Sequence, residues 1–230
     1  MLQSFADRFY LNFIMDDRWL YLVNGLKTTL IVTFFAVLIG ILLGFLIAVC
    51  RSTCDKTGKL KILNSICKLY LTVVRGTPVV VQLLIIYFVI FGSVKIDKTF
   101  VAILAFGLNS GAYVAEIIRG GIMSIDNGQF EAGRSLGFNY PQTMIYIVLP
   151  QVFKNVLPAL ANEFIVLLKE TSVAGYIALE DLTKGGDLIR SRTYDAFMPL
   201  IAVALIYLAL VLLFSKLVSL LERRLRNSER

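Results

Sequence analysis

Three charged residues and one amide interrupt a largely apolar segment that covers residues 156–174, and they are Asn162, Glu163, Lys169 and Glu170. With about 3.6 residues per helical turn, Glu163 and Glu170 fall on nearly one face, and Asn162 and Lys169 share the adjacent face. We expect this helix to point its carboxylates and the Lys169 ammonium towards the interior of the bundle. A carboxylate can bind an ammonium group and a lysine can bind a carboxylate, so these are groups that a zwitterionic amino acid requires. The alternative is a Glu–Lys network that only packs or gates the helix. Both readings stay open for Lys169 and Glu170, whereas Glu163 favours substrate binding.

Neighbouring apolar segments add two weaker substrate-binding candidates, Asn109 and Gln82. A lone buried amide also serves to hold two helices together by hydrogen bonds. Glu116 and Arg119, three residues apart, are spaced for an ion pair on one helical face. We expect that pair to be structural rather than to contact substrate.

The composition excludes most catalytic chemistry. Histidine is absent, which removes the usual general base and the commonest metal ligand. The three cysteines, Cys50, Cys54 and Cys67, have no metal-site spacing and are expected to be reduced and unpaired. We therefore expect neither a catalytic residue nor a metal site.

Hydrophobic residues make up 57% of the 230-residue chain, charged residues make up 17%, and the mean hydropathy is +0.76. These values indicate an all-α integral membrane protein. A spanning helix needs about 20 mostly apolar residues. Five segments meet or approach this requirement, and we expect them at residues 22–49, 77–91, 100–118, 156–174 and 197–221. The second is short but continues from a helical stretch that begins near Leu60.

The distribution of basic residues predicts the topology. One side of the spans carries Arg51, Lys56, Lys59, Lys61, Arg119, Arg134, Lys154, Arg223, Arg224, Arg226 and Arg230. The other side carries the smaller set Arg8, Arg18, Lys95, Lys98, Lys184, Arg190 and Arg192. Because Lys and Arg accumulate on the cytoplasmic side, we expect the carboxy-terminus inside and the amino-terminus outside.

The net charge of +7 is explained by this accumulation of basic residues beside the membrane, so we expect no nucleic-acid partner. Residues 1–17 lack the features of a cleavable signal peptide.

The longest expected non-membrane stretch is the cytoplasmic loop 119–155. Asn139 can cap a helix that has Pro141 in its first turn, and we expect this short helix to end near Val148. Pro150 is expected to mark a helix edge. A loop with this much predicted order suggests a surface that binds another protein.

The same loop contains a spaced motif. It consists of Glu131-Ala132-Gly133, Gly137 after three residues, and Ile147, Leu149 and Pro150 at its end. This pattern resembles the EAA motif of ABC-importer permeases, with Gly133 in place of the second alanine. In that family the motif forms a short coupling helix that binds a groove of the ATPase subunit. The resemblance assigns ATPase coupling to Glu131, Ala132, Gly133, Gly137, Leu149 and Pro150.

Four further stretches resemble the subfamily that transports histidine, glutamine, glutamate, arginine, cystine and opines. They are Asn24-Gly25-Leu26-x-Thr28, Arg75-Gly76-Thr77-Pro78, Tyr113-x-x-Glu116-x-x-Arg119-Gly120-Gly121 and Leu168-Lys169-Glu170-Thr171-Ser172. Together with the EAA-like motif they occur in the family's order from about Gly25 to Leu221. The resemblance implies one permease domain over residues 1–230, with the five-helix fold of a type I importer.

The resemblance also implies partners. Such permeases work as two membrane subunits with two ATP-binding subunits, and an extracytoplasmic amino-acid-binding protein delivers the substrate. The second membrane subunit is expected to be another copy or a close homologue. This chain has no GxxxxGK[ST] loop, so ATP and Mg²⁺ are expected on the separate ATPase and no cofactor on this chain. The location implied is the bacterial inner membrane.

Two other functions remain as rivals. An ion-coupled transporter or channel would need no ATPase, and a membrane-embedded enzyme could use the intramembrane carboxylates. The absence of histidine and the EAA-like loop argue against the enzyme. The pairs Gly40–Gly44 and Gly107–Gly111 have small-xxx-small spacing, which we read as helix packing within the bundle rather than as a dimer contact.

Overall fold

The computed structural model describes residues 4–227, and every regular element in that range is a helix. The elements in order are α1 (Phe5–Phe9), η1 (Tyr10–Ile14), η2 (Met15–Asp17), α2 (Trp19–Thr57), α3 (Lys61–Gly76), α4 (Val79–Leu84), η3 (Ile85–Ile90), α5 (Lys98–Met123), α6 (Asn127–Ser135), α7 (Tyr140–Thr143), η4 (Met144–Val148), α8 (Leu149–Glu170), η5 (Thr171–Ile177), α9 (Leu182–Thr193) and α10 (Phe197–Asn227). The all-helical fold class is confirmed for this part of the chain.

Four helical stretches in the described range are long and apolar enough to cross a membrane. They begin at Trp19, Lys98, Tyr140 and Phe197. A fifth span exists if α3 and the helix from Val79 to Ile90 are counted together, and these two are bent by 109°. The expectation that the second span continues directly from the stretch near Leu60 is therefore wrong in geometry, because the chain turns sharply between the two parts.

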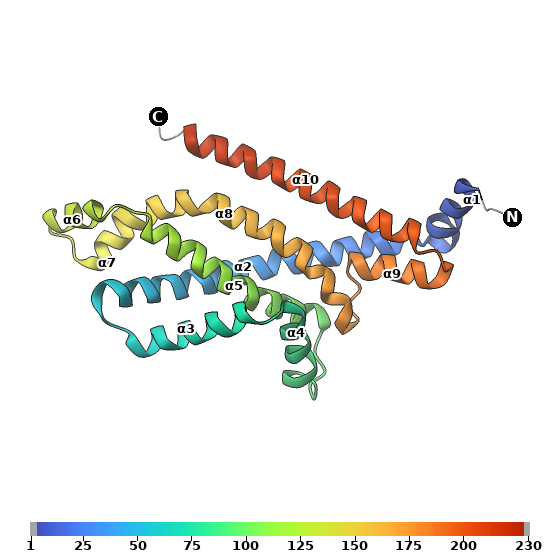
Figure 1. Cartoon of the computed structure of the whole chain (residues 1–230), viewed down its shortest axis with the longest axis horizontal. Helices are drawn as coiled ribbons and strands as arrows, with labels where there is room; N and C mark the ends of the chain where they lie inside the picture. The colour runs from blue at the N-terminus through green and yellow to red at the C-terminus, as the bar shows by residue number, and fades with distance from the viewer. Residues whose placement is uncertain (1–3, 228–230) are drawn as a thin grey trace.

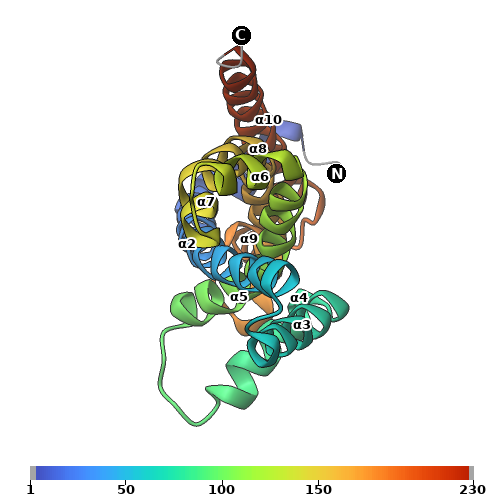
Figure 2. The same cartoon turned by 90° about the vertical axis from the view of Figure 1, so that its left-hand side faces the viewer.

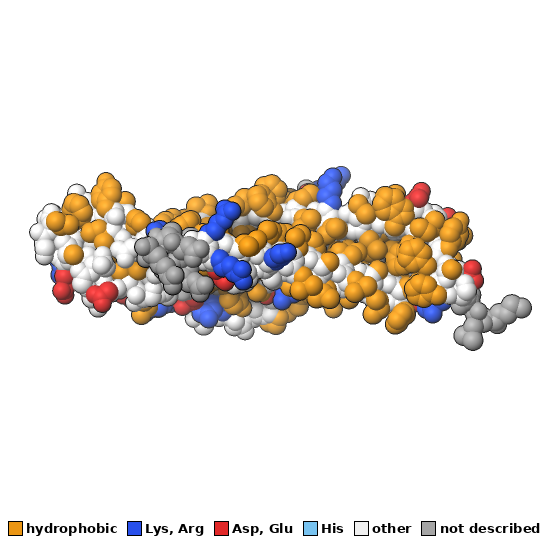
Figure 3. Space-filling view, turned by 90° about the horizontal axis from the view of Figure 1, so that it is seen from above, with side chains coloured by type: hydrophobic (Ala, Val, Ile, Leu, Met, Phe, Trp, Pro, Cys, Tyr) orange, Lys and Arg blue, Asp and Glu red, His pale blue; other side chains and the backbone are white. Residues whose placement is uncertain are grey.

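The long helices form an elongated bundle with distinct ends (Figure 1). Helices α6 and α7 lie at one end, and α1 and α9 lie at the other. Helix α10 and the α3–α4 pair lie on opposite sides of the α2–α5–α8 core (Figure 2). Hydrophobic side chains cover most of the face seen in Figure 3, as expected for a surface in contact with lipid. The carboxy-terminal part of α10 points towards the end that carries α6 and α7.

The centre of the bundle is the contact between α2 and α5, where glycines allow close approach. A Cβ atom at Gly40 would lie 2.8 Å from the Ser110 Oγ, and one at Gly44 would lie 2.8 Å from the backbone nitrogen of Ala115. On the facing helix, a Cβ at Gly107 would lie 2.9 Å from Ile39 side-chain carbons. The prediction that these small residues pack helices within the bundle is confirmed.

The sharp bend between α3 and α4 follows from Thr77 and Pro78. Both residues have extended backbone angles, and proline cannot donate the hydrogen bond that would continue a helix. The carbonyl groups left free at the end of α3 are bound by Gln82, whose Nε2 donates to the oxygens of Val74 at 2.7 Å and Thr77 at 3.0 Å. Gln82 therefore stabilises the bend.

The chain does not break at Pro150. Helix α7, the π-helical turn η4 and α8 form one continuous helix from Tyr140 to Glu170. The expected end near Val148 and the expected helix edge at Pro150 are wrong. The reason lies in η4, where the Leu149 N–H bonds to the carbonyl of Met144, five residues back, and this wider turn accommodates a proline without a helix end.

The opposite end of the bundle is held together by backbone contact and by an ion pair. A Cβ at Gly25 would lie 2.5 Å from the Asp181 carbonyl oxygen, so α9 begins directly against α2. The Arg8 guanidinium donates three hydrogen bonds to Asp195, two through Nη2 at 2.8 Å and 2.9 Å and one through Nε at 3.1 Å, and these bonds lower the pKa of Asp195. Residues near the amino-terminus are thereby fixed to the α9–α10 connection.

Candidate functional site

The predicted docking loop folds around a sharp turn between α6 and α7. Gly137 has a positive φ of 82°. Its N–H bonds to the Arg134 carbonyl and the Phe138 N–H bonds to the Gly133 carbonyl, which is the Schellman pattern that ends a helix. Asn139 then starts α7 with a capping box shared with Gln142, so the predicted cap is confirmed. This backbone conformation, with its positive φ, therefore favours glycine at position 137.

Gly133 allows α6 and α7 to touch. A Cβ atom there would lie 2.6 Å from both the Cγ2 and the Oγ1 of Thr143. The departure from the family pattern, glycine for the second alanine, therefore matches a contact that would exclude a methyl group. Glu131 and Ala132 are exposed on α6 and are free to contact another protein. Leu149 packs on the buried cluster below the loop, while Pro150 is exposed.

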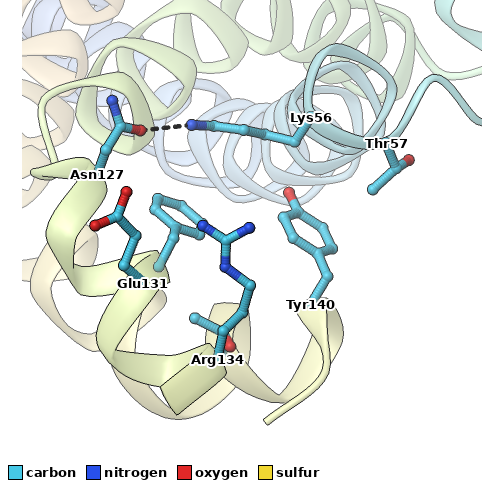
Figure 4. A pocket seen from close by; sticks show the side chains of 8 residues that line it. Lys56, Thr57, Asn127, Glu131, Arg134 and Tyr140 are labelled. Carbon is cyan, nitrogen blue, oxygen red and sulfur yellow. Dashed lines mark hydrogen bonds between the residues drawn. The ribbon is translucent and has the colours of Figure 1, made fainter. Parts of the chain in front are cut away.

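A cavity of about 410 Å³ opens beside this turn. Figure 4 shows side chains from α6 and α7 converging with the end of α2. The Lys56 Nζ donates to the Asn127 Oδ1 at 2.8 Å and lies 4.6 Å from the centre of the Phe130 ring. The lining residues are Lys56, Thr57, Asn127, Phe130, Glu131, Arg134, Tyr140 and Thr143. This end of the bundle therefore presents a hollow with charges of both signs.

Sequence reasoning missed part of this cavity. Lys56 and Thr57 lie about 70 positions before Asn127 and Glu131, and only folding brings them together. Phe130 stacks on Tyr140 with a ring-centre distance of 6.3 Å and an interplanar angle of 9°. The one signal that the sequence offered was the small cluster of basic residues after the first span.

Glu163, the leading substrate candidate, lies inside the bundle. Its side chain accepts a hydrogen bond of 2.9 Å from the Ser110 Oγ of α5, and the residue is 9% exposed. Glu170 lies on the same side of α8 and is half-buried. The shared face predicted for these two carboxylates agrees with the structure. A carboxylate in this position needs a hydrogen-bond donor or a cation, because burial disfavours an isolated charge.

Asn162 and Lys169 occupy the other predicted face, and both are exposed. The expectation that Lys169 points to the interior of the bundle is wrong for this chain, because its side chain is exposed, whereas Glu163 is buried against Ser110 of α5. The structure therefore separates the lysine from the Glu163 side of the helix. The role of Asn162 and Lys169 in substrate binding stays a prediction.

Asn109 and Gln82 contact each other, which agrees with the alternative that these amides hold two helices together. The Asn109 Nδ2 donates to the Gln82 Oε1 at 3.2 Å, and Gln82 in turn binds the end of α3. The expected pair of Glu116 with Arg119 is wrong. Glu116 pairs with Arg51 on α2, and Arg119 pairs with Asp55 at 3.3 Å, because neighbouring helices offer closer partners than the same helix does.

Comparison with known proteins gives a consistent result. Residues 36–227 match the model of a family described as binding-protein-dependent transport system inner membrane component. The chain is similar to a putative glutamine transport system permease protein GlnP of Rickettsia typhi, with 36% identity over 208 residues that cover 90% of this chain and 93% of the relative. It is also similar to the arginine transport system permease protein ArtQ of Bacillus subtilis, with 38% identity over 211 residues covering 91% of this chain and 94% of the relative.

Solved structures show the same fold. A chain of an amino acid ABC transporter crystallised with histidines is 42% identical, with a TM-score of 0.84, and the match covers 97% of this chain and all of the other. A chain of the MetNI methionine ABC transporter, in an inward-facing conformation, has a TM-score of 0.77 at 19% identity, covering 91% of this chain and 98% of the other. The second likeness concerns the fold alone.

Proposed function

The chain belongs to the family of binding-protein-dependent transport system inner membrane components, and on that premise we propose that it carries a polar amino acid into the cytoplasm. It is a multi-pass membrane permease and the transmembrane subunit of an ABC importer for amino acids. The proposal rests on the ordered α6–α7 turn at one end of the helical bundle. It also rests on the similarity of this bundle to an amino acid ABC transporter chain, which it matches over that chain's whole length. We propose the bacterial inner membrane as its location and residues 1–230 as one permease domain.

The family implies an ATPase and a substrate-binding partner. We propose that loop 119–155 docks a separate ATPase that holds ATP and Mg²⁺. We also propose that two permease subunits, this chain and either a second copy or a close homologue, assemble with two ATPases. An extracytoplasmic binding protein would deliver the amino acid to the end that carries α1 and α9. The exposed Glu131 and the hollow beside it supply charge and shape for the ATPase contact.

We expect the carboxy-terminus to be cytoplasmic and the amino-terminus external. The end of the bundle with α6 and α7 carries the basic residues that follow the first span, and the positive-inside rule assigns that end to the cytoplasm. A reporter that is active only in the cytoplasm, fused after Arg230, is expected to be active. Activity of an exterior-only reporter at the same position, with the same expression, would overturn this orientation.

Glu163 is our leading candidate for holding the positively charged group of the substrate, which makes a cationic amino acid a reasonable cargo. Glu163→Gln keeps the shape and the Ser110 contact but removes the charge. Loss of a charge-assisted hydrogen bond costs about 1.5–3 kcal/mol, so the apparent affinity for substrate is expected to fall by about one to two decades. The measurement is uptake of a panel of labelled amino acids by the transporter reconstituted with its ATPase and binding protein.

The matched control is Glu180→Gln, which removes an exposed carboxylate from the connection before α9. This variant is expected to transport with unchanged affinity. If Glu163→Gln assembles and moves every amino acid at the wild-type affinity and rate, Glu163 is a packing residue and the substrate site lies elsewhere.

A further inference from the structure

A second polar cavity, of about 450 Å³, lies between α2, α3 and α5, away from the α6–α7 turn. Three cations and one carboxylate line it: Arg51, Lys68, Arg75 and Glu116. Glu116 pairs closely with Arg51, and its Oε1 is 3.9 Å from the Arg75 Nη1. Among the described residues, Lys68 has no carboxylate within salt-bridge distance, and the Nε of Arg51 is buried without a hydrogen-bond partner. The cavity therefore has an excess of positive charge.

The depth of this cavity follows from the helices. The apolar stretch of α2 ends at Val49, and Cys50 shares a buried cluster with Cys67 of α3. Lys68 and Arg51 directly follow these two cysteines, so both lie at the level where the apolar part of α2 ends. Arg75 is about 10 Å further along α3, at about 1.5 Å per residue, and its side chain extends back towards Glu116. Charges collect at this level because it is a boundary between hydrocarbon and water.

Helix α3 has three faces. Asn64, Cys67 and Leu71 are buried against the bundle. The adjacent face carries a polar stripe at heptad spacing, which consists of Lys61, Lys68 and Arg75 with Ser65 and Thr72 between them. The next face is apolar and exposed, with Ile62 at 81%, Ile66 at 59%, Leu69 at 65% and Val73 at 52% exposure.

We propose that this cavity binds the phosphate head group of an anionic phospholipid in the leaflet level with Arg51. The surplus cations match the charge of the phosphate, and the exposed apolar face of α3 runs beside them for the acyl chains. A free phosphate ion would use the cations but not the apolar face. This lipid site is separate from the α6–α7 turn and from Glu163, and it does not depend on the proposed direction of transport.

The test is lipid binding to the transporter purified with its full-length chains, measured by native mass spectrometry. Phosphatidylglycerol and phosphatidylcholine with identical acyl chains are compared. Each basic side chain near a membrane surface contributes about a fivefold gain in affinity for an anionic lipid. With two surplus cations, phosphatidylglycerol is expected to bind about thirtyfold more tightly than phosphatidylcholine. Lys68→Gln is expected to weaken phosphatidylglycerol binding about fivefold, and inorganic phosphate at the lipid concentration should not displace it.

Lys216→Gln is the matched control, because Lys216 is an exposed lysine on α10 that does not line the cavity. It should leave lipid binding unchanged. Lys68 is itself exposed, so its substitution should leave folding intact, and an unchanged unfolding temperature would verify this. The proposal is overturned if the two lipids bind equally, if Lys68→Gln binds as the wild type does, or if inorganic phosphate or a free amino acid displaces the lipid at equal concentration.

Discussion

Replacing Gly44 with leucine is expected to prevent the bundle from packing. Even a Cβ atom at this position would lie 2.6 Å from Val114 Cγ1 and 2.8 Å from the Ala115 backbone nitrogen. The Ala115 nitrogen belongs to the backbone of α5 and cannot rotate away, so α2 and α5 must separate. Over-packing a buried contact costs about 1–3 kcal/mol and sometimes more, and we expect at least about 3 kcal/mol for four added carbon atoms. The change adds apolar surface, so membrane insertion itself should be retained.

The measurement is the unfolding temperature and the monodisperse fraction of the detergent-solubilised chain. Gly120→Leu is the control, since Gly120 is an exposed glycine of α5 with no atom within 4 Å of a Cβ. Gly120→Leu should give a stable, monodisperse chain, whereas Gly44→Leu should give mostly aggregated protein. Equal stability of the two variants would contradict the close contact between α2 and α5.

Replacing Gly137 with valine is expected to separate the permease from its ATPase. A φ of 82° costs a branched residue such as valine about 1–2 kcal/mol. The Schellman turn should therefore open, and α6 should lose its position against α7. No atom lies within 4 Å of a Cβ at this position, so the membrane bundle should remain folded. A strain of that size corresponds to about a five- to thirtyfold change in an equilibrium constant, so we expect ATPase association to weaken by about that factor and ATP-driven uptake to be lost.

The control is Gly137→Asn, because asparagine tolerates a positive φ better than valine does. This variant adds a side chain at the same site with less backbone strain, and it should retain ATPase binding. Normal ATPase association and uptake in Gly137→Val would show that the ATPase docks elsewhere.

Several features of the fold could be predicted from residues close together in the sequence. Apolar length gave the spans, since crossing hydrocarbon requires about 20 residues in one helix, although α2 and α5 extend beyond the predicted ends at Leu22, Val49 and Ile118. The cap at Asn139 and the close-packing glycines were also predictable, because each depends on residues only a few positions apart. The EAA-like spacing drew attention to Gly137 as a coupling residue, but the turn at this glycine, with its positive φ, is seen only in the structure.

Contacts between side chains far apart in the chain could not be predicted from the sequence. Glu116 pairs with Arg51 of α2, 65 positions away, rather than with Arg119. The spacing rule for ion pairs on one helix describes an isolated helix, whereas packing brings other helices within reach of the carboxylate. In the same way, Gln82 binds the broken end of α3, and Lys56 joins the hollow beside Glu131.

The sequence by itself determined that this chain is a membrane bundle with an ordered loop between two spans. It also determined the helix cap at Asn139 and the glycine pairs that pack helices, because apolar length, capping and helical spacing are local properties. Only the tertiary structure decided that Glu163 is buried against Ser110 while Lys169 is exposed, that the chain bends by 109° after α3, and that α8 continues through Pro150. Each of these depends on which helix covers which face, and that is set by the sum of many contacts between segments far apart in the chain.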